Sequence, residues 1–407
     1  PYINLQSSSD STLNIQFLID AFKRDSSNFP FRLNIDTLKL EQTRVRYNEI
    51  LVDQLDLDLA LPVLSQDSLD IQLHSMHMRA RLDQLDASFE TDLHGGLDSI
   101  FAKNMQLTFR EQSLFSGDIA IFNPTDLESM YVEARCNDLY CNDVLLQDLL
   151  SQLQIPSIAL PNIITQLGDV RYRGNIYGRL ELLNLQGTFR TLFGSIHVNG
   201  NIKSDTTLQN FAFHGHVATT KFQIGQLIEH SDLGSVTLQA DVEGAITTQQ
   251  LVYCTAIADI QQIEYKGYSY QHLHLDGELR PDEVNGRLNI DDENICLNIE
   301  GLADWSMEDT RLDITMQLSN FKPASLHLIE QYPELELEAT TYISLYTSGK
   351  GKEMLDHMTG YVIVDSLQIH NGIRQTTMEQ FKLLIDSDWK NGMPTHQMRV
   401  QSDYMTA

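Results

Sequence analysis

Hydrophobic and polar residues alternate along most of this chain. In residues 54–61 (QLDLDLAL), Leu55, Leu57, Leu59 and Leu61 fall on one side of an extended backbone, and the aspartates fall on the other. A period of two predicts a β-strand with one buried face. The same alternation recurs in residues 69–73, 105–109, 312–318 and 335–339.

A second recurring feature is a glycine on the apolar side of the alternation. The pattern apolar–x–Gly–x–apolar places six glycines on the apolar side: Gly178, Gly200, Gly215, Gly244, Gly277 and Gly301. Glycine inside a strand usually marks a bend or a close approach of two backbones, and it lets a sheet curl. We favour strand bends over hairpin turns for most of them, and Asn199-Gly200 stays open as a turn.

Other local signals predict turns and irregularities. Asn-Gly pairs at 199–200, 285–286, 371–372 and 391–392 are tight-turn or bulge signals. The acidic run at 291–293 predicts a hairpin turn. The alternation shifts by one residue between 69–74 and 76–82, which predicts a bulge or a bend.

Helical spacing is rare and short. It occurs in residues 13–22, in residues 143–153 with Asp143 as a cap, and in residues 322–332 after a proline. We therefore predict a strand-rich segment with a short N-terminal helix over 1–142, a helical or irregular junction over 143–168, and a second strand-rich segment over 169–407.

The predicted fold class is all-β. At roughly 11–15 residues per strand and turn, the chain has room for about 27–37 strands. A single open sheet so wide must curl, split or roll up. We expect an elongated, strongly curved, mostly antiparallel sheet rolled into a groove, with a few short helices.

The apolar side of this sheet supplies candidate ligand-lining residues. An ordinary sandwich would bury that side against a second sheet, whereas a groove would leave it open to acyl chains. Each buried lipid methylene would contribute about 0.8 kcal/mol. Besides the leucines of 54–61 and the six glycines, the candidates are Ile196, Val198, Phe211, Phe213, Val236, Leu238, Leu273, Leu275, Ile314 and Leu318.

Composition and charge narrow the function classes. The 407 residues include 28 Lys or Arg and 56 Asp or Glu, a formal charge of −28. Such a surface repels phosphate groups, so we expect neither nucleic-acid binding nor electrostatic membrane binding. The sequence contains no run of about 20 apolar residues that would predict a membrane-spanning helix. It also contains no signal peptide, and we expect any anchor or export signal to lie outside this chain.

Cysteines and histidines offer only weak candidates for a metal or redox site. Cys136 and Cys141 lie close enough in sequence to pair in an oxidising compartment, and free, partly buried thiols are the interpretation that we favour. The pairs at 214 and 216 and at 272 and 274 are His-x-His sequences that could share a strand face. No further ligand at a recognisable spacing completes a metal site, so solvated histidines and no cofactor are expected.

Catalytic signatures are scarce. The sequence has no H-E-x-x-H, no G-x-S-x-G and no complete P-loop. A carbohydrate-active β-helix with paired carboxylates would usually also need exposed aromatic residues, and only two tryptophans occur, Trp305 and Trp389. We therefore expect a non-enzymatic protein.

Longer phrases of the sequence resemble a known family. FLIDAF (17–22) followed by FRLNIDTLKLEQTRVRY (31–47) resembles the AsmA-like proteins. Residues 160–180, 187–202, 222–244 and 265–305 resemble the TamB-type translocation and assembly module proteins of the Bacteroides group. The resemblance covers most of residues 12–407, and its motifs are structural phrases without a catalytic signature.

The resemblance implies a very long envelope protein, anchored in the inner membrane by an N-terminal helix and extending across the periplasm. This chain would be an internal, periplasmic segment of it. The implied fold is a β-taco, a rolled sheet with an apolar groove. The implied function is phospholipid transport between the inner and outer membranes, in support of outer-membrane biogenesis.

The resemblance leaves a second function open. The alternative is a scaffold or chaperone for the assembly or secretion of outer-membrane β-barrel proteins, acting by strand addition along exposed edges. The implied partners are an acyl-chain lipid and a BamA-like barrel protein, the latter contacted through regions outside this chain.

Overall fold

The structure is a computed structural model. It describes residues 2–5, 32–47, 50–65, 69–81, 87–96, 98–109, 111–126, 128–152, 166–205, 209–305, 309–348, 358–390 and 393–402. The predicted helix over 13–22 and the turn at Asn391-Gly392 lie outside the described residues.

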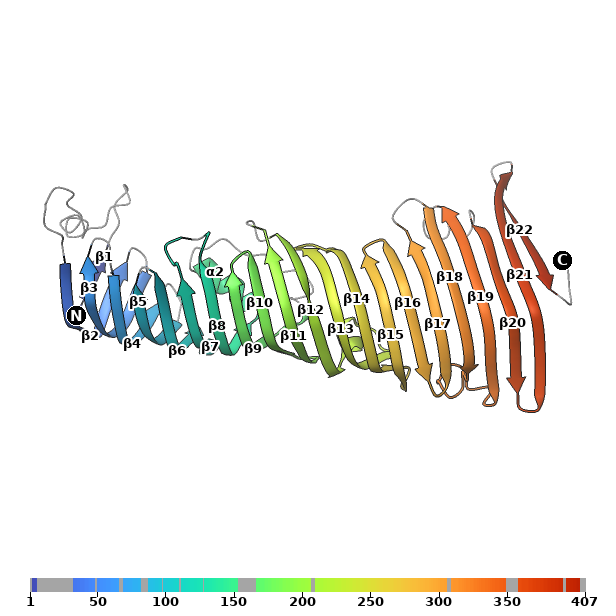
Figure 1. The fold of residues 1–407 in the computed structure, drawn as a ribbon, viewed down its shortest axis with the longest axis horizontal. Helices are drawn as coiled ribbons and strands as arrows, with labels where there is room; N and C mark the ends of the chain where they lie inside the picture. The colour runs from blue at the N-terminus through green and yellow to red at the C-terminus, as the bar shows by residue number, and fades with distance from the viewer. Residues whose placement is uncertain are drawn as a thin grey trace. The chain divides into compact units, whose positions relative to one another are not determined.

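The chain divides into two compact units. Figure 1 labels the strands of both units in chain order. The first unit comprises residues 1–192 and 198–209, and the second comprises residues 193–197 and 210–407. The strands and helix of the first unit are β1 (Tyr2–Leu5), β2 (Arg32–Tyr47), β3 (Ile50–Ser65), β4 (Leu69–Arg81), β5 (Ala87–Gly96), β6 (Ser99–Phe109), β7 (Gln112–Phe122), β8 (Tyr131–Cys141), α2 (Asp143–Gln152), β9 (Val170–Arg179) and β10 (Leu182–Thr191).

The second unit is also built almost entirely of strands. Strand β11 (Gly194–Ser204) contributes residues to both units. The elements of the second unit are β12 (Asn210–Phe222), α4 (Ile224–Leu227), β13 (Leu233–Thr247), β14 (Leu251–Tyr265), β15 (Tyr268–Arg280), β16 (Glu283–Asp292), β17 (Ile295–Asp304), β18 (Asp309–Phe321), β19 (Leu335–Ser348), β20 (Thr359–Asn371), β21 (Arg374–Lys390) and β22 (Met393–Ser402).

Both units are antiparallel meanders. From β2 to β10 and from β12 to β22, each strand pairs antiparallel with the next one in sequence. The short β1 instead pairs parallel with the end of β2. The predicted all-β, mostly antiparallel fold is confirmed. The described residues form 22 strands, fewer than expected, because many strands of the second unit run for 13 to 17 residues.

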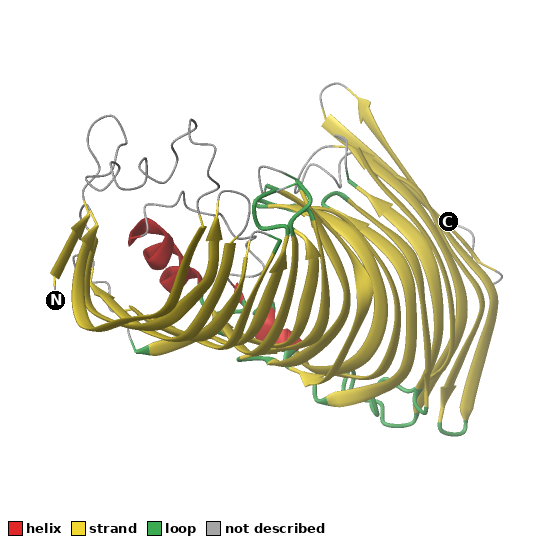
Figure 2. Cartoon of the chain, turned by 60° about the vertical axis from the view of Figure 1, so that its left-hand side comes forward, coloured by secondary structure: helices red, strands yellow, loops and turns green. Residues whose placement is uncertain are grey.

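The strands of the second unit bend strongly along their length. In Figure 2, β13 to β20 arch in the same direction, one behind the other. The pairing register also slips at several places, as bulges require. In the first unit, the register between β4 and β5 shifts between Leu73 and His77. The bulge predicted from the shifted alternation in this stretch is therefore confirmed.

Glycine positions test the turn predictions. Gly178, Gly200, Gly215, Gly244, Gly277 and Gly301 all lie inside strands. The alternative that Asn199-Gly200 forms a hairpin turn is therefore wrong, because both residues lie within β11. The turn predicted at Asn285-Gly286 is also wrong, because both residues pair within β16.

Two of the predicted turns are confirmed. Gly372 has a φ of 60°, and it lies in the turn that joins β20 to β21. Residues 293 and 294 form the turn that joins β16 to β17, at the acidic run.

The helix predicted from residue 143 is present as α2, but its cap is one residue earlier. The side-chain Oδ1 of Asn142 accepts a hydrogen bond from the backbone N–H of Leu145 at 3.2 Å. Asn142 therefore satisfies a free N–H of the first turn, and Asp143 is the first helical residue, where its charge favours the helix dipole. Among the described residues, no helix is both long enough and apolar enough to cross a membrane.

The helix predicted over 322–332 is wrong. The segment makes one helical turn, which is closed by backbone bonds from Leu328 N–H to the Pro323 carbonyl at 2.8 Å and from His327 N–H to the Ala324 carbonyl at 3.1 Å. His327 has a φ of 59°, so this is a Schellman ending, which stops a helix.

Cys136 and Cys141, which the sequence left open as a disulfide pair, are not bonded to each other. Phe115, Cys136 and Tyr172 are buried together on β7, β8 and β9. Cys136 and Cys141 are both free thiols. They lie on one strand, where five residues span roughly 16 Å. Because a disulfide bridges Cα atoms no more than about 7 Å apart, these two thiols cannot pair while the strand is extended.

Candidate functional site

Two apolar rows cross the second unit perpendicular to its strands. Because antiparallel pairing sets residues directly opposite each other, one residue from each strand falls in each row. The glycine row runs from β13 to β21 through Val242, Ala256, Gly277, Gly286, Gly301, Ile314, Ile343, Val362 and Leu383. The leucine row lies two residues along each strand and comprises Ala240, Ala258, Leu275, Leu288, Ile299, Met316, Thr341, Val364 and Phe381. No residue of either row is charged.

Three consecutive strands contribute only glycine to the glycine row. We call Gly277, Gly286 and Gly301 the glycine ladder. A Cβ on Gly286 would lie 2.6 Å from the carbonyl oxygen of Asp276, and a Cβ on Gly301 would lie 2.5 Å from that of Asp313. These backbones approach too closely for a side chain, so the ladder leaves a strip of sheet without side chains.

A cavity of about 440 Å³ lies over the glycine ladder. Its walls come from β14 to β18 and are largely aliphatic, with Leu275, Leu288, Ile299, Leu279 and Val284 among them. Leu279 is 45% exposed and Val284 is 44% exposed, so one margin of the cavity is open to solvent. The candidates Leu275, Gly277, Gly301 and Ile314 are brought together here.

Two charged residues of the cavity lining, Glu278 and Arg287, each pair with another charged residue. Arg287 donates from Nη2 to Glu300 Oε2 at 2.7 Å, and Arg280 forms an ion pair with Glu278 at 2.6 Å. Cys254 also lines the cavity, and burial raises the pKa of its thiol, so it stays protonated and acts as a small apolar side chain. The cavity therefore suits hydrocarbon better than a polar metabolite.

Two residues beyond the leucine row, on the side away from the glycine row, a loop residue of the chain covers the apolar side. Leu326 is 0% exposed and packs with Tyr270, Leu273, Ile290 and Ile295, which we call the sealed cluster. The candidate Leu318 is partly buried against the same cluster. Leu273 is buried and Leu318 is partly buried there, and neither lines the open cavity.

Other candidates of the second unit lie on neighbouring strands. Phe211 and Phe213 pair with Ile246 and Gly244, and the Phe213 ring covers Gly244, where a Cβ would meet its Cζ at 2.6 Å. Further candidates continue the apolar side as cross-strand pairs: Gly215 with Val242, Leu238 with Ile260, and Val236 with Ile263. Val236 is buried, and Leu238 is partly exposed.

The candidates of the first unit form a separate set. The leucines of 54–61 lie in β3, partly exposed, and Leu57 faces Leu40 on one side and Met76 on the other. Gly178 is buried in β9, opposite Val132 and Leu183.

Strand β11 carries the remaining candidates, Ile196, Val198 and Gly200. All of them are partly exposed. Their alternation with the exposed His197 and Asn199 keeps them on a common side of the strand.

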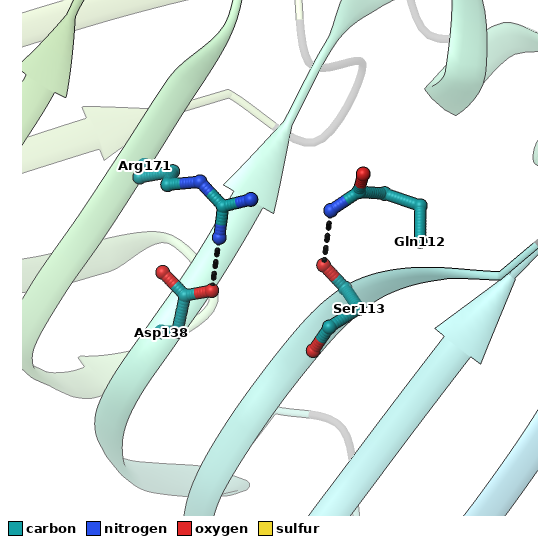
Figure 3. A network of polar contacts seen from close by, with 4 residues as sticks. All are labelled: Gln112, Ser113, Asp138 and Arg171. Atoms are coloured by element: carbon teal, nitrogen blue, oxygen red, sulfur yellow. Dashed lines mark hydrogen bonds and ion pairs between the residues drawn. The ribbon is translucent and has the colours of Figure 1, made fainter.

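The opposite side of the strands is polar. Figure 3 shows Arg171 of β9 paired with Asp138 of β8 on this side. The same figure shows Gln112 Nε2 donating to the backbone carbonyl of Ser113 at 3.2 Å, at the end of β7 that pairs with Phe109. In the second unit, His216 Nδ1 lies 3.0 Å from Asp241 Oδ1, and His274 Nδ1 lies 2.7 Å from Asp259 Oδ1.

These histidines are exposed and do not form a metal centre. His272 has a φ of 53° and is skipped in the pairing of β14 with β15, so it forms a bulge within β15 beside Leu273. Within the described ranges, no group of His, Cys, Asp and Glu residues is arranged to hold a metal ion.

Sequence reasoning missed two residues of this region. Gly286 was assigned to a turn because of the preceding asparagine, although Val284, Leu288 and Ile290 alternate around it as in the other glycine strands. That alternation was the signal that would have found it. Leu326 was assigned to a helix, and nothing in its local sequence predicts that it packs on β15 and β16.

Comparisons with known proteins add nothing to this geometry. No family model, no curated protein and no solved structure matches the chain.

Proposed function

We propose that the chain is a non-enzymatic segment of an envelope protein whose apolar groove carries phospholipid acyl chains between the inner and outer membranes. The observation that carries the proposal is the partly open aliphatic cavity over the glycine ladder. It belongs to uncharged rows that continue across β13 to β21. Such a row presents similar apolar contacts on every strand, so a ligand could move along it without being held at one fixed site. Transport requires this property.

The energetic argument concerns hydrocarbon. Each methylene transferred from water to these walls contributes about 0.8 kcal/mol, so even part of an acyl chain is held usefully. The headgroup would remain at the solvent-exposed margin near Leu279 and Val284. In this proposal the segment works in the periplasm, tethered to the inner membrane through a helix outside this chain, and a BamA-like barrel protein is contacted elsewhere.

Site-specific photocrosslinking in cells tests the proposal. A benzoylphenylalanine at Leu275 faces the cavity, and the same group at the neighbouring His274 faces the polar side and serves as the matched control. We expect lipid adducts at position 275 and none at position 274. Adducts to outer-membrane β-barrel proteins at either position, without lipid, would overturn the lipid proposal in favour of the scaffold function.

A further inference from the structure

The segment that joins β18 to β19, residues 322–334, lies against the apolar side of the second unit. We call it the strap. Its Leu326 is 0% exposed within the sealed cluster, and Pro323 is also fully buried. Ile329, three residues after Leu326, is 45% exposed. The strap therefore packs Leu326 and Leu328 against the sealed cluster and leaves Ile329 partly in solvent.

Hydrogen bonds fix the strap to the hairpin turns beneath it. The backbone N–H of Lys322 donates to the carbonyl of Asn294 at 3.0 Å, and just before the strap, at the end of β18, Asn320 Nδ2 donates to the carbonyl of Glu293 at 2.7 Å. His327 Nδ1 lies 3.2 Å from the carbonyl of Lys266. The Schellman ending holds Leu326 in place between these anchors, so its burial is built into the fold.

The sealed cluster and the open cavity are continuous. Leu273 of the cluster lies two residues before Leu275 of the cavity, on the same side of β15. Leu288 belongs to both, because it packs against the cluster and also lines the cavity. Leu326 thus packs over Leu273 and Ile290, which lie next to the cavity walls on β15 and β16.

We propose that Leu326 sets the depth of the groove, by occupying with the chain's own side chain the space that a ligand's hydrocarbon would otherwise enter. Leu326 is a positioning residue that confines acyl chains to the leucine row and the glycine ladder. This inference rests on the proposed lipid function, which supplies the ligand.

The test maps where hydrocarbon reaches. The full chain is mixed with vesicles of dioleoyl phosphatidylethanolamine that contain a phosphatidylethanolamine with a diazirine in its acyl chain. After irradiation, labelled residues are located by mass spectrometry. We expect label at Leu275, Leu288 and Ile299 in the unchanged protein, and none at Leu273 or Ile290.

Leu326→Ala should extend the label to Leu273 and Ile290, raising its yield there severalfold, while the label at Leu275 persists. Leu326→Met should restore the original pattern, because it refills the space, and Ile329→Ala should not change it. Leu326→Val provides a milder change in the same direction, should the alanine variant fold poorly by circular dichroism.

The outcomes separate the two proposals. Label at Leu275 in every variant, with none at Leu273 or Ile290 after the substitutions at Leu326, would overturn the role of Leu326 and leave the lipid function standing. Label at Leu273 in the unchanged protein would also overturn that role. Absence of label at Leu275 in all variants would overturn the lipid function itself.

Discussion

Gly286 lies directly opposite Gly277, and a Cβ on Gly286 would stand 2.7 Å from the Cα of Gly277. This close approach of two strands makes the cavity floor bare backbone. The apolar side chains of the neighbouring rows then become walls, and the space between them is open to a ligand.

The glycine ladder gives a first prediction. Gly286→Ala should lower the free energy of unfolding by about 1–3 kcal/mol, because its Cβ would meet the backbone of Asp276 and Gly277. Gly277→Ala should have a smaller effect, since its nearest contact would be 3.0 Å, with the Asn285 carbonyl oxygen. Urea unfolding measures both, and equal stabilities of the two variants would contradict the close approach.

The strap gives a second prediction. Leu326→Ala should destabilise the protein by about 2–5 kcal/mol, the usual range for a fully buried leucine. Ile329→Ala, on the exposed face of the same strap, should stay within about 0.5 kcal/mol of the unchanged protein. Thermal or urea unfolding of the pair measures the difference, and similar losses for the two variants would be inconsistent with the packing of Leu326.

Cysteine reactivity gives a third prediction. Burial raises the pKa of the Cys136 thiol to about 11. Since the thiolate is the reactive form, Cys136 should resist iodoacetamide at pH 8 and react only as the pH approaches that value or the protein unfolds. Cys296 is the internal control, because it is less buried, although burial and the neighbouring Asp291 also raise the pKa of its thiol. Mass spectrometry follows both sites, and labelling of Cys136 as fast as Cys296 would refute the prediction.

A carboxylate in the second unit gives a fourth prediction. The backbone N–H of Ser235 donates to Glu264 Oε2 at 3.0 Å and holds the pKa of Glu264 below its usual range. A folded-state pKa below the unfolded value of about 4.3 contributes stability above that pH, and the contribution is lost as the pH falls through the folded value.

The corresponding measurement compares melting temperatures at neutral and acidic pH. Glu264→Gln should have a lower melting temperature than the unchanged protein at pH 7. Near pH 3 the difference between the two melting temperatures should be smaller. Glu229→Gln, an exposed glutamate after α4, is the control. A difference for Glu264→Gln that does not depend on pH would rule out the linkage.

Much of the fold could be predicted from the sequence because the alternation of hydrophobic and polar residues is a property of each strand by itself. It identifies strands, and it also assigns Leu275 and Gly277 to the same side of β15. Register cannot be predicted in this way. Only the pairing of β15, β16 and β17 aligns Gly277, Gly286 and Gly301 in one row.

The errors have physical causes. At Gly286 the short-range preference of Asn-Gly for turns was outweighed by cross-strand pairing of the residues on both sides. Leu273 and Leu318 were expected on the apolar side, but local alternation does not show that Leu326, from a loop, packs in the same cluster. The strand number was overestimated because average strand lengths do not apply to strands such as β21, with its 17 residues.

The most direct test of the central claim is to extract and quantify lipid from the purified chain by mass spectrometry. We predict that the unchanged protein retains phospholipid. Leu275→Glu should lose it while staying folded, and Asn289→Glu on the polar side should retain it. Equal phospholipid content in the two glutamate variants, or none in the unchanged protein, would contradict the account.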